Sequence, residues 1–110
     1  MQELQKLHVV VAEPFDDASL ACLQGLATIE LLKDSAPATL LEAVGRADAL
    51  LVKSKAHVTA KIIEAACKLK VIGRASQNYD HIDLRAAGRK NIRVVYSPHV
   101  AVSSVAEFTL

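Results

Sequence analysis

The sequence predicts a three-layer α/β sandwich built on a five-stranded parallel sheet. Three observations support this fold class: short apolar runs alternate with segments of helical periodicity, the connections between them are short, and the apolar residues are mostly aliphatic. Hydrophobic residues make up 52% of the 110 residues but aromatic ones only 4%, so the core must consist of Val, Leu, Ile and Ala. This composition suits strands that are buried on both faces and covered by alanine-rich helices.

The first half of the chain supplies three of the expected strands, at residues 7–12, 28–32 and 49–52. The first is stopped by a Glu-Pro pair, the second contains a Glu as expected at a sheet edge, and the third is the most central by composition. Helices are expected between them, over residues 16–25 and 35–45, where Leu and Val recur at helical spacing. The second helix opens with Pro near its first turn, where a missing N–H costs little.

The second half continues the same alternation. Thr59 can cap a helix that runs through Leu69, residues 70–73 form the fourth strand, and a helix covers residues 80–88. Residues 92–96 form the fifth strand. With right-handed crossovers these strands take the order 2-1-3-4-5, the flavodoxin-like one, with helices on both faces.

The tail and the overall composition indicate one domain over residues 1–110. Ser104 and Glu107 have capping-box spacing, so a helix begins there, and the chain ends about two turns later as if it were truncated. A formal net charge of +1 provides no general field for nucleic acid or a membrane surface, and no stretch approaches the ~20 apolar residues of a span. Cys22 and Cys67 lack metal-ligand spacing and are interpreted as packed thiols of a cytoplasmic protein.

Polar residues gather where the first, third and fourth strands end, in the loops at residues 13–15, 53–55 and 74–78. Ligands of open parallel sheets bind at this carboxyl edge. The cations and the hydroxyl and amide donors of these loops suit a small carboxylate or phosphate. Arg74 is expected on the rim of the pocket that the loops form. For Lys55 a solvated loop charge is the favoured interpretation. The candidate substrate-binding residues are Lys53, Ser54, Arg74, Ser76, Gln77 and Asn78.

Several other kinds of site are not supported. None of the four histidines has an identifiable carboxylate orienter, and Asp80 and Asp83 are better explained as groups that cap a helix. Ser103 and Ser104 also read as caps. No G-x-G-x-x-G follows a strand, which excludes a Rossmann-type dinucleotide site. The third strand ends in Lys53 rather than an Asp phosphoacceptor, which excludes a receiver domain, and the loop after the first strand lacks the hydroxyl groups of a flavodoxin.

The segment at residues 71–83 resembles the pattern V-x-G-R-A-G-x-G-x-D-N-x-D of the substrate-binding domain of D-2-hydroxyacid dehydrogenases, phosphoglycerate dehydrogenases above all. Residues 48–54 similarly resemble D-A-L-I-V-R-S, and residues 104–107 resemble the S-V-A-E that in this family begins the helix crossing into the nucleotide-binding domain. These pieces occur in the family's order and spacing over nearly the whole chain.

The resemblance implies a two-domain, usually dimeric oxidoreductase that passes hydride between NAD and the C2 of a 2-hydroxy or 2-oxo acid. Lys53, Ser54, Arg74, Gln77 and Asn78 would then touch the substrate, and Gln77 would also approach the nicotinamide. The family's catalytic Arg, Glu and His belong to the nucleotide-binding domain, so this chain alone should bind no cofactor and catalyse nothing. This sequence departs from the family pattern at Lys53, Ser76, Asn78, Tyr96 and Ala101. The resemblance therefore implies the general 2-hydroxyacid class rather than phosphoglycerate in particular.

Two hypotheses of different classes follow. The first is a substrate-binding domain separated from its dehydrogenase; its exposed apolar surface should drive self-association as a homodimer, for which exchange of the C-terminal helix is one route. The second is a free-standing flavodoxin-like module that binds a small anion or serves as a scaffold. Binding of NADH and turnover of a 2-oxo acid would test whether the catalytic half is missing.

Overall fold

The computed structural model describes residues 7–14, 27–53, 55–75 and 81–97. The helix expected at residues 16–25 and the helix start at residues 103–107 lie outside these ranges. Among the candidate site residues, Ser54, Ser76, Gln77 and Asn78 also lie outside them.

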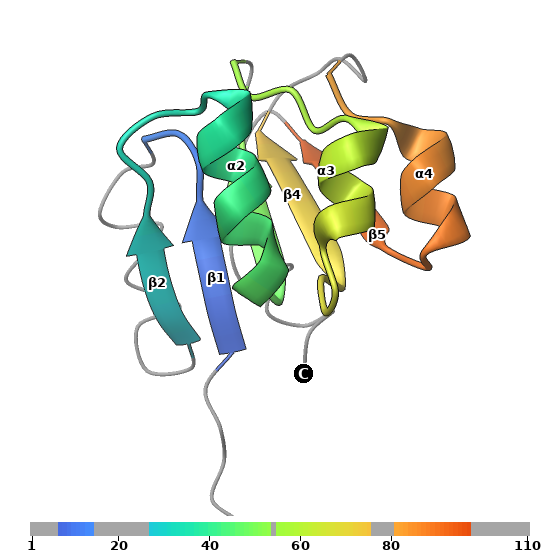
Figure 1. Cartoon of the computed structure of the whole chain (residues 1–110), viewed down its shortest axis with the longest axis horizontal. Helices are drawn as coiled ribbons and strands as arrows, with labels where there is room; N and C mark the ends of the chain where they lie inside the picture. Colours follow the sequence, from blue (N-terminus) through green and yellow to red (C-terminus); the bar gives the residue numbers. More distant parts are fainter. Residues whose placement is uncertain (1–6, 15–26, 54, 76–80, 98–110) are drawn as a thin grey trace, which may run out of the picture.

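The centre of the molecule is a five-stranded sheet whose pairs are all parallel (Figure 1). Its strand order, β2-β1-β3-β4-β5, confirms the predicted topology. The central strand β3 is buried at every residue, whereas the edge strand β2 is partly exposed, as its Glu indicated. The strands are β1 (Leu7–Val11), β2 (Ala27–Leu31), β3 (Ala49–Val52), β4 (Val71–Ala75) and β5 (Arg93–Ser97).

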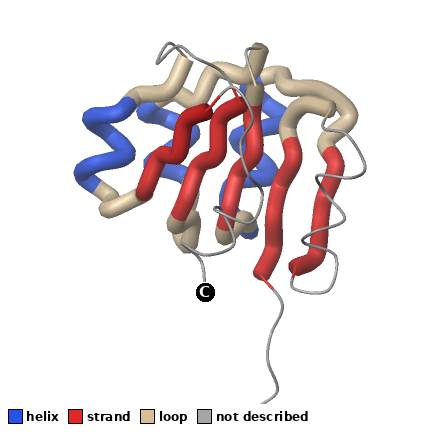
Figure 2. Tube along the Cα trace, turned by 180° about the vertical axis from the view of Figure 1, so that it is seen from behind, coloured by secondary structure: helices blue, strands red, loops and turns tan. Residues whose placement is uncertain are grey.

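The described helices all cover the same face of the sheet, and the view from behind shows the strands in front of them (Figure 2). They are α2 (Pro37–Ala43), followed directly by the short 3₁₀ turn η1 (Val44–Arg46), then α3 (Ala60–Ala65) and α4 (Leu84–Arg89). No helix in the described part of the chain is both long and apolar enough to cross a membrane.

The starts of α2 and α3 follow the sequence, whereas the described part of the fourth helix starts later than predicted and α3 ends earlier. Pro37 occupies the first turn of α2, and the hydroxyl of Thr59 accepts the Ile62 N–H at 3.4 Å. The described part of the fourth helix begins only at Leu84, because the Asp83 carboxylate accepts the Ala86 N–H at 2.9 Å and so marks the N-cap. Helix α3 ends at Ala65 instead of Leu69 because the backbone is already extended at Ala66.

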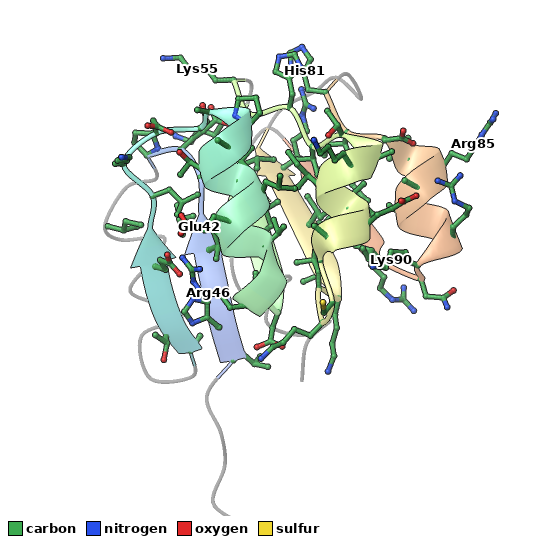
Figure 3. All side chains as sticks on the ribbon, in the orientation of Figure 1. Glu42, Arg46, Lys55, His81, Arg85 and Lys90 are labelled. Carbon is green, nitrogen blue, oxygen red and sulfur yellow. The ribbon has the colours of Figure 1, made fainter. Side chains whose placement is uncertain are left out.

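A lysine from the next helix closes the end of α3. The Lys90 Nζ atom donates to the main-chain oxygens of Ala66 at 2.7 Å, and of Ile63 and Glu64 at 3.3 Å. Carbonyls in the last turn of a helix have no partner within the helix, and a cation there also suits the helix dipole. Lys90 therefore joins α4 to α3 (Figure 3).

Strand side chains alternate between two apolar layers. Val10, Leu50, Val52 and Ile72 pack against the helices in the larger cluster. Val9, Val11, Leu51 and others form the smaller cluster on the opposite face.

At the amino edge of the sheet the buried Asp48 connects two strands. Its carboxylate accepts the His8 N–H at 2.8 Å, while its own N–H donates to the His8 oxygen at 2.8 Å. Asp48 therefore stabilises the edge of the sheet that lies opposite the loops of interest.

Candidate functional site

The carboxyl edge of the sheet joins the loop after β1 to the loop after β3 through one buried carboxylate. Glu13 is only 6% exposed. Its carboxylate accepts the backbone N–H groups of Lys53, of Lys55 at 2.9 Å and of Ala56 at 3.1 Å. The predicted convergence of these two loops is confirmed, and Glu13 is the group that holds them together.

Lys53 and Arg74 lie at this same edge. Val52, the last residue of β3, is the register partner of Arg74 in the neighbouring parallel strand β4. Lys53 follows Val52 directly and is partly buried. The two cations therefore belong to adjacent strand ends, as the strand order requires.

The side chain of Arg74 does not lie on the rim of the pocket, which corrects the expectation from the sequence. Arg74 is a residue of β4 and is fully buried, at 0% exposure. Residues that pair in a parallel ladder face the same side, so Arg74 shares the helix-facing layer with Val52. In the described structure, its Nε and Nη1 atoms have no hydrogen-bond partner.

A buried guanidinium with unpaired N–H groups is unusual, since burial of a charge is costly unless that charge is paired. Arginine presents a planar fork of donors that suits carboxylate and phosphate oxygens. The arrangement at Arg74 is therefore chemically suited to an anion that approaches from the carboxyl edge.

A hollow of about 450 Å³ lies beside this edge, at the ends of β1 and β2. Lys33 and Lys55 supply its cations, Glu13 and Asp34 its carboxylates, and Leu31 part of its apolar wall. The pKa of Asp34 is lowered by a hydrogen bond from Thr39 and then by the Ala36 N–H, so Asp34 stays charged. The sequence analysis missed Lys33, although its position directly after the second apolar run could have identified it.

The loop after β3 is also tied to the segment that precedes α4. Val58 and Ile82 form a parallel bridge, in which the Val58 N–H donates to the His81 oxygen at 2.6 Å. His81 has a φ of 78°, in the left-handed region, and its ring stacks on that of His57 with centroids 4.0 Å apart. Both rings line a shallow hollow of about 300 Å³ that also includes Asp83.

The histidine expectations hold only in part. His8 does have a carboxylate partner, contrary to the expectation, because its Nε2 atom lies 2.7 Å from Oε1 of Glu30. The two residues come from neighbouring strands, and Arg46 also binds Glu30, so this is a surface network away from the carboxyl edge. The described residues contain no group of three or more His, Cys, Asp or Glu that could hold a metal ion.

Comparison with known proteins gives a consistent family. A family model described as the D-isomer specific 2-hydroxyacid dehydrogenase catalytic domain matches residues 9–109. The D-3-phosphoglycerate dehydrogenase of Methanocaldococcus jannaschii is 39% identical over 104 residues, which cover 94% of this chain and 20% of that enzyme. The chain thus spans about a fifth of that relative's length.

Solved structures agree with the sequence match. A protein of Pyrococcus horikoshii superposes with a TM-score of 0.80 and 29% identity, over 84% of this chain and 28% of its own. The NAD⁺-bound 3-phosphoglycerate dehydrogenase of Entamoeba histolytica gives a TM-score of 0.73 and 26% identity, over 84% of this chain and 33% of its own.

Proposed function

Because the chain belongs to the D-isomer specific 2-hydroxyacid dehydrogenase family, we propose that it binds the substrate of such an oxidoreductase, a small 2-hydroxy or 2-oxo acid, at the carboxyl edge of its sheet. The observation that carries the proposal is Arg74, a buried guanidinium whose Nε and Nη1 atoms lack partners in the described structure. An acid bound at this edge would supply the missing acceptor oxygens. Lys53, at the end of the adjacent strand, adds a second cation.

The hollow beside Lys33 and Lys55 supports a second anionic group on the substrate. The carboxylates of this hollow already have donors, because Glu13 accepts from Lys55 and Ala56, and Asp34 from Thr39 and Ala36. The two ammonium groups suit a phosphate, and the relative from M. jannaschii is a phosphoglycerate dehydrogenase. We therefore propose a phosphorylated acid, with its carboxylate towards Arg74 and Lys53 and its phosphate towards Lys33 and Lys55. Ser54, Ser76, Gln77 and Asn78 remain proposed contacts from the family resemblance.

The cofactor of the proposed reaction is NAD, which would accept or supply the hydride at C2 of the acid. The described strand ends of this chain do not fit a dinucleotide, because none carries the glycine-rich loop that accommodates a pyrophosphate. We propose that this chain binds and orients the acid only. Gln77 is the residue proposed to approach the nicotinamide.

Assembly and location complete the proposal. Self-association as a homodimer is proposed from the family resemblance, with exchange of the C-terminal helix as one route. The cytoplasm is the proposed compartment. A free-standing anion-binding module is the second candidate function, which the buried Nε and Nη1 atoms of Arg74 support equally, because a guanidinium suits any small anion.

Calorimetric titration of the 110-residue chain tests the proposal with three ligands: 3-phosphoglycerate, unphosphorylated glycerate and NADH. We expect 3-phosphoglycerate to bind more tightly than glycerate, and NADH not to bind. Replacing Lys33 and Lys55 together by Gln should remove the preference for the phosphorylated acid, whereas Lys61→Gln on α3 should preserve it. Equal affinity for both acids in the unmodified chain would contradict the phosphate assignment, and binding of neither acid would contradict the proposed function. Tight binding of inorganic phosphate without any binding of either acid would favour the second candidate.

A further inference from the structure

We propose that Glu13 is a positioning residue, which holds the backbone of Lys53, Lys55 and Ala56 so that the side chain of Lys55 can receive the substrate anion. The inference rests on the proposed function and deepens it. Glu13 lies two residues beyond the end of β1 and some forty residues before the loop it holds.

The Glu13 carboxylate is an anion, supplied by the protein itself, on which three backbone N–H groups converge. Its Oε2 atom accepts from Lys53 and Ala56, and its Oε1 atom accepts from Lys55. Backbone N–H groups that point to one place favour negative charge there. Because Glu13 already provides that charge, these three N–H groups are not left for a substrate.

Because Glu13 binds these backbone N–H groups, a ligand must meet side chains instead. The N–H groups of Lys53 and Lys55 are turned towards Glu13, so the positive charge that meets the anion here is the side chain of Lys55. Lys55 is exposed, and its side chain extends away from the molecule at the same end as His81 (Figure 3). Glu13 therefore acts on the substrate through Lys55.

A glutamate is needed because both of its oxygens accept. In the Glu13→Gln variant one oxygen would become an NH₂ group, so either orientation of the amide would set a donor against at least one backbone N–H. The side chain of Asp is shorter by one methylene and would not reach the same three groups. We expect Glu13→Gln to leave the sheet intact, because Val11 and Ala12 keep their places in the core, while the loop loses its fixed conformation.

The matched control is Asp48→Asn. Asp48 is also a buried carboxylate that accepts a backbone N–H from another strand, but it lies at the amino edge of the sheet. Both variants should lower the melting temperature. Only Glu13→Gln should change the loop at the carboxyl edge.

The experiment measures two quantities on the 110-residue chain and its variants: amide hydrogen exchange by NMR, and the Kd for inorganic phosphate. Glu13→Gln should accelerate exchange at Lys55 and Ala56 at least tenfold and raise the Kd about tenfold or more. Asp48→Asn should accelerate exchange at His8 and leave the Kd within twofold. If Glu13→Gln does not fold, Glu13→Asp replaces it with the same expectations.

The outcomes separate this inference from the proposed function. Faster exchange at Lys55 and Ala56 with an unchanged Kd would overturn the positioning role, as would unchanged exchange. An equal loss of phosphate affinity in Asp48→Asn would also overturn it, because lost stability would then explain both. If the unmodified chain binds no phosphate, the proposed phosphate site fails, and the exchange rates alone still show whether Glu13 orders the loop.

Discussion

Arg74 lies directly opposite Val52 in the parallel ladder between β3 and β4, so a guanidinium faces the same apolar layer as a valine. The arginine is completely buried, and its Nε and Nη1 atoms have no partner in the part of the chain that the structure describes. A buried charge of this kind lowers stability unless a ligand compensates for it. The buried charge of Arg74 should therefore favour ligand binding but lower the free energy of unfolding of the unliganded protein.

Replacing Arg74 by Met tests both effects. Met has a similar length and no charge, so the free energy of unfolding should stay the same or rise by about 1 kcal/mol. The affinity for an acidic ligand should fall about tenfold or more, because the buried donor that pairs with it is lost. Urea unfolding and calorimetric titration measure the two effects.

Arg85→Met is the matched control. Arg85 belongs to the exposed surface of α4 and points away from the molecule (Figure 3). This substitution should alter neither quantity by much. A large loss of stability in Arg74→Met, with ligand affinity retained, would show that Arg74 is a structural residue.

Lowering the pH should weaken the hydrogen bonds that join Glu30 to Arg46 and His8. Hydrogen bonds from Arg46 and then from His8 lower the pKa of Glu30 from 4.5 to about 2. Because the pKa of this acid is lower in the folded state, its contribution to stability is complete above about pH 4.5 and disappears as the pH falls towards 2.

Arg46→Met should raise the pKa of Glu30 towards its ordinary value. It should also lower the free energy of unfolding slightly at neutral pH, by a small amount because the pair is exposed to solvent. NMR titration of the Glu30 carboxyl carbon measures the pKa, and urea unfolding at several pH values measures the cost. A cost that persists unchanged at pH 2 would contradict the assignment.

The two capped helices should differ in their sensitivity to loss of the cap. Asp83 accepts its N–H at 2.9 Å and carries a charge at a helix N-terminus, whereas Thr59 accepts at 3.4 Å. Asp83→Ala should therefore lower the free energy of unfolding by about 1 kcal/mol, and Thr59→Ala by about half as much. Denaturant unfolding of both variants gives the ratio, and the reverse order would contradict the geometry.

Removing the amine of Lys90 should destabilise the contact between α3 and α4. Lys90→Met keeps the aliphatic stem but leaves the oxygens of Ile63, Glu64 and Ala66 without this donor. We expect a loss of about 1–2 kcal/mol in the free energy of unfolding, as for a hydrogen bond to a charged group. Lys61→Met on the exposed side of α3 is the control and should be nearly neutral.

The strands and their order could be predicted because they depend on local features of the sequence. Aliphatic runs such as residues 49–52 have no polar residue to place at a surface, and short connections leave few topologies for five parallel strands. Asp83, Pro37 and Thr59 were recognised because helix starts have a local chemical signature.

The details of the site could not be predicted because they depend on register. Arg74 follows Gly73 and looks like a loop residue until its pairing with Val52 is known. Glu13 binds N–H groups some forty residues away, and no local pattern indicates such a contact. His8 and Glu30 meet only because β1 and β2 pair in one particular register.

The most direct test of the central claim is an amide NMR titration of the 110-residue chain with 3-phosphoglycerate. The carboxyl-edge site predicts saturable shifts at Lys33, Lys53, Lys55 and Arg74, with little change at Asp48 and Lys70 on the amino edge. Shifts confined to the amino edge, or no saturable shift at any of these residues, would contradict it.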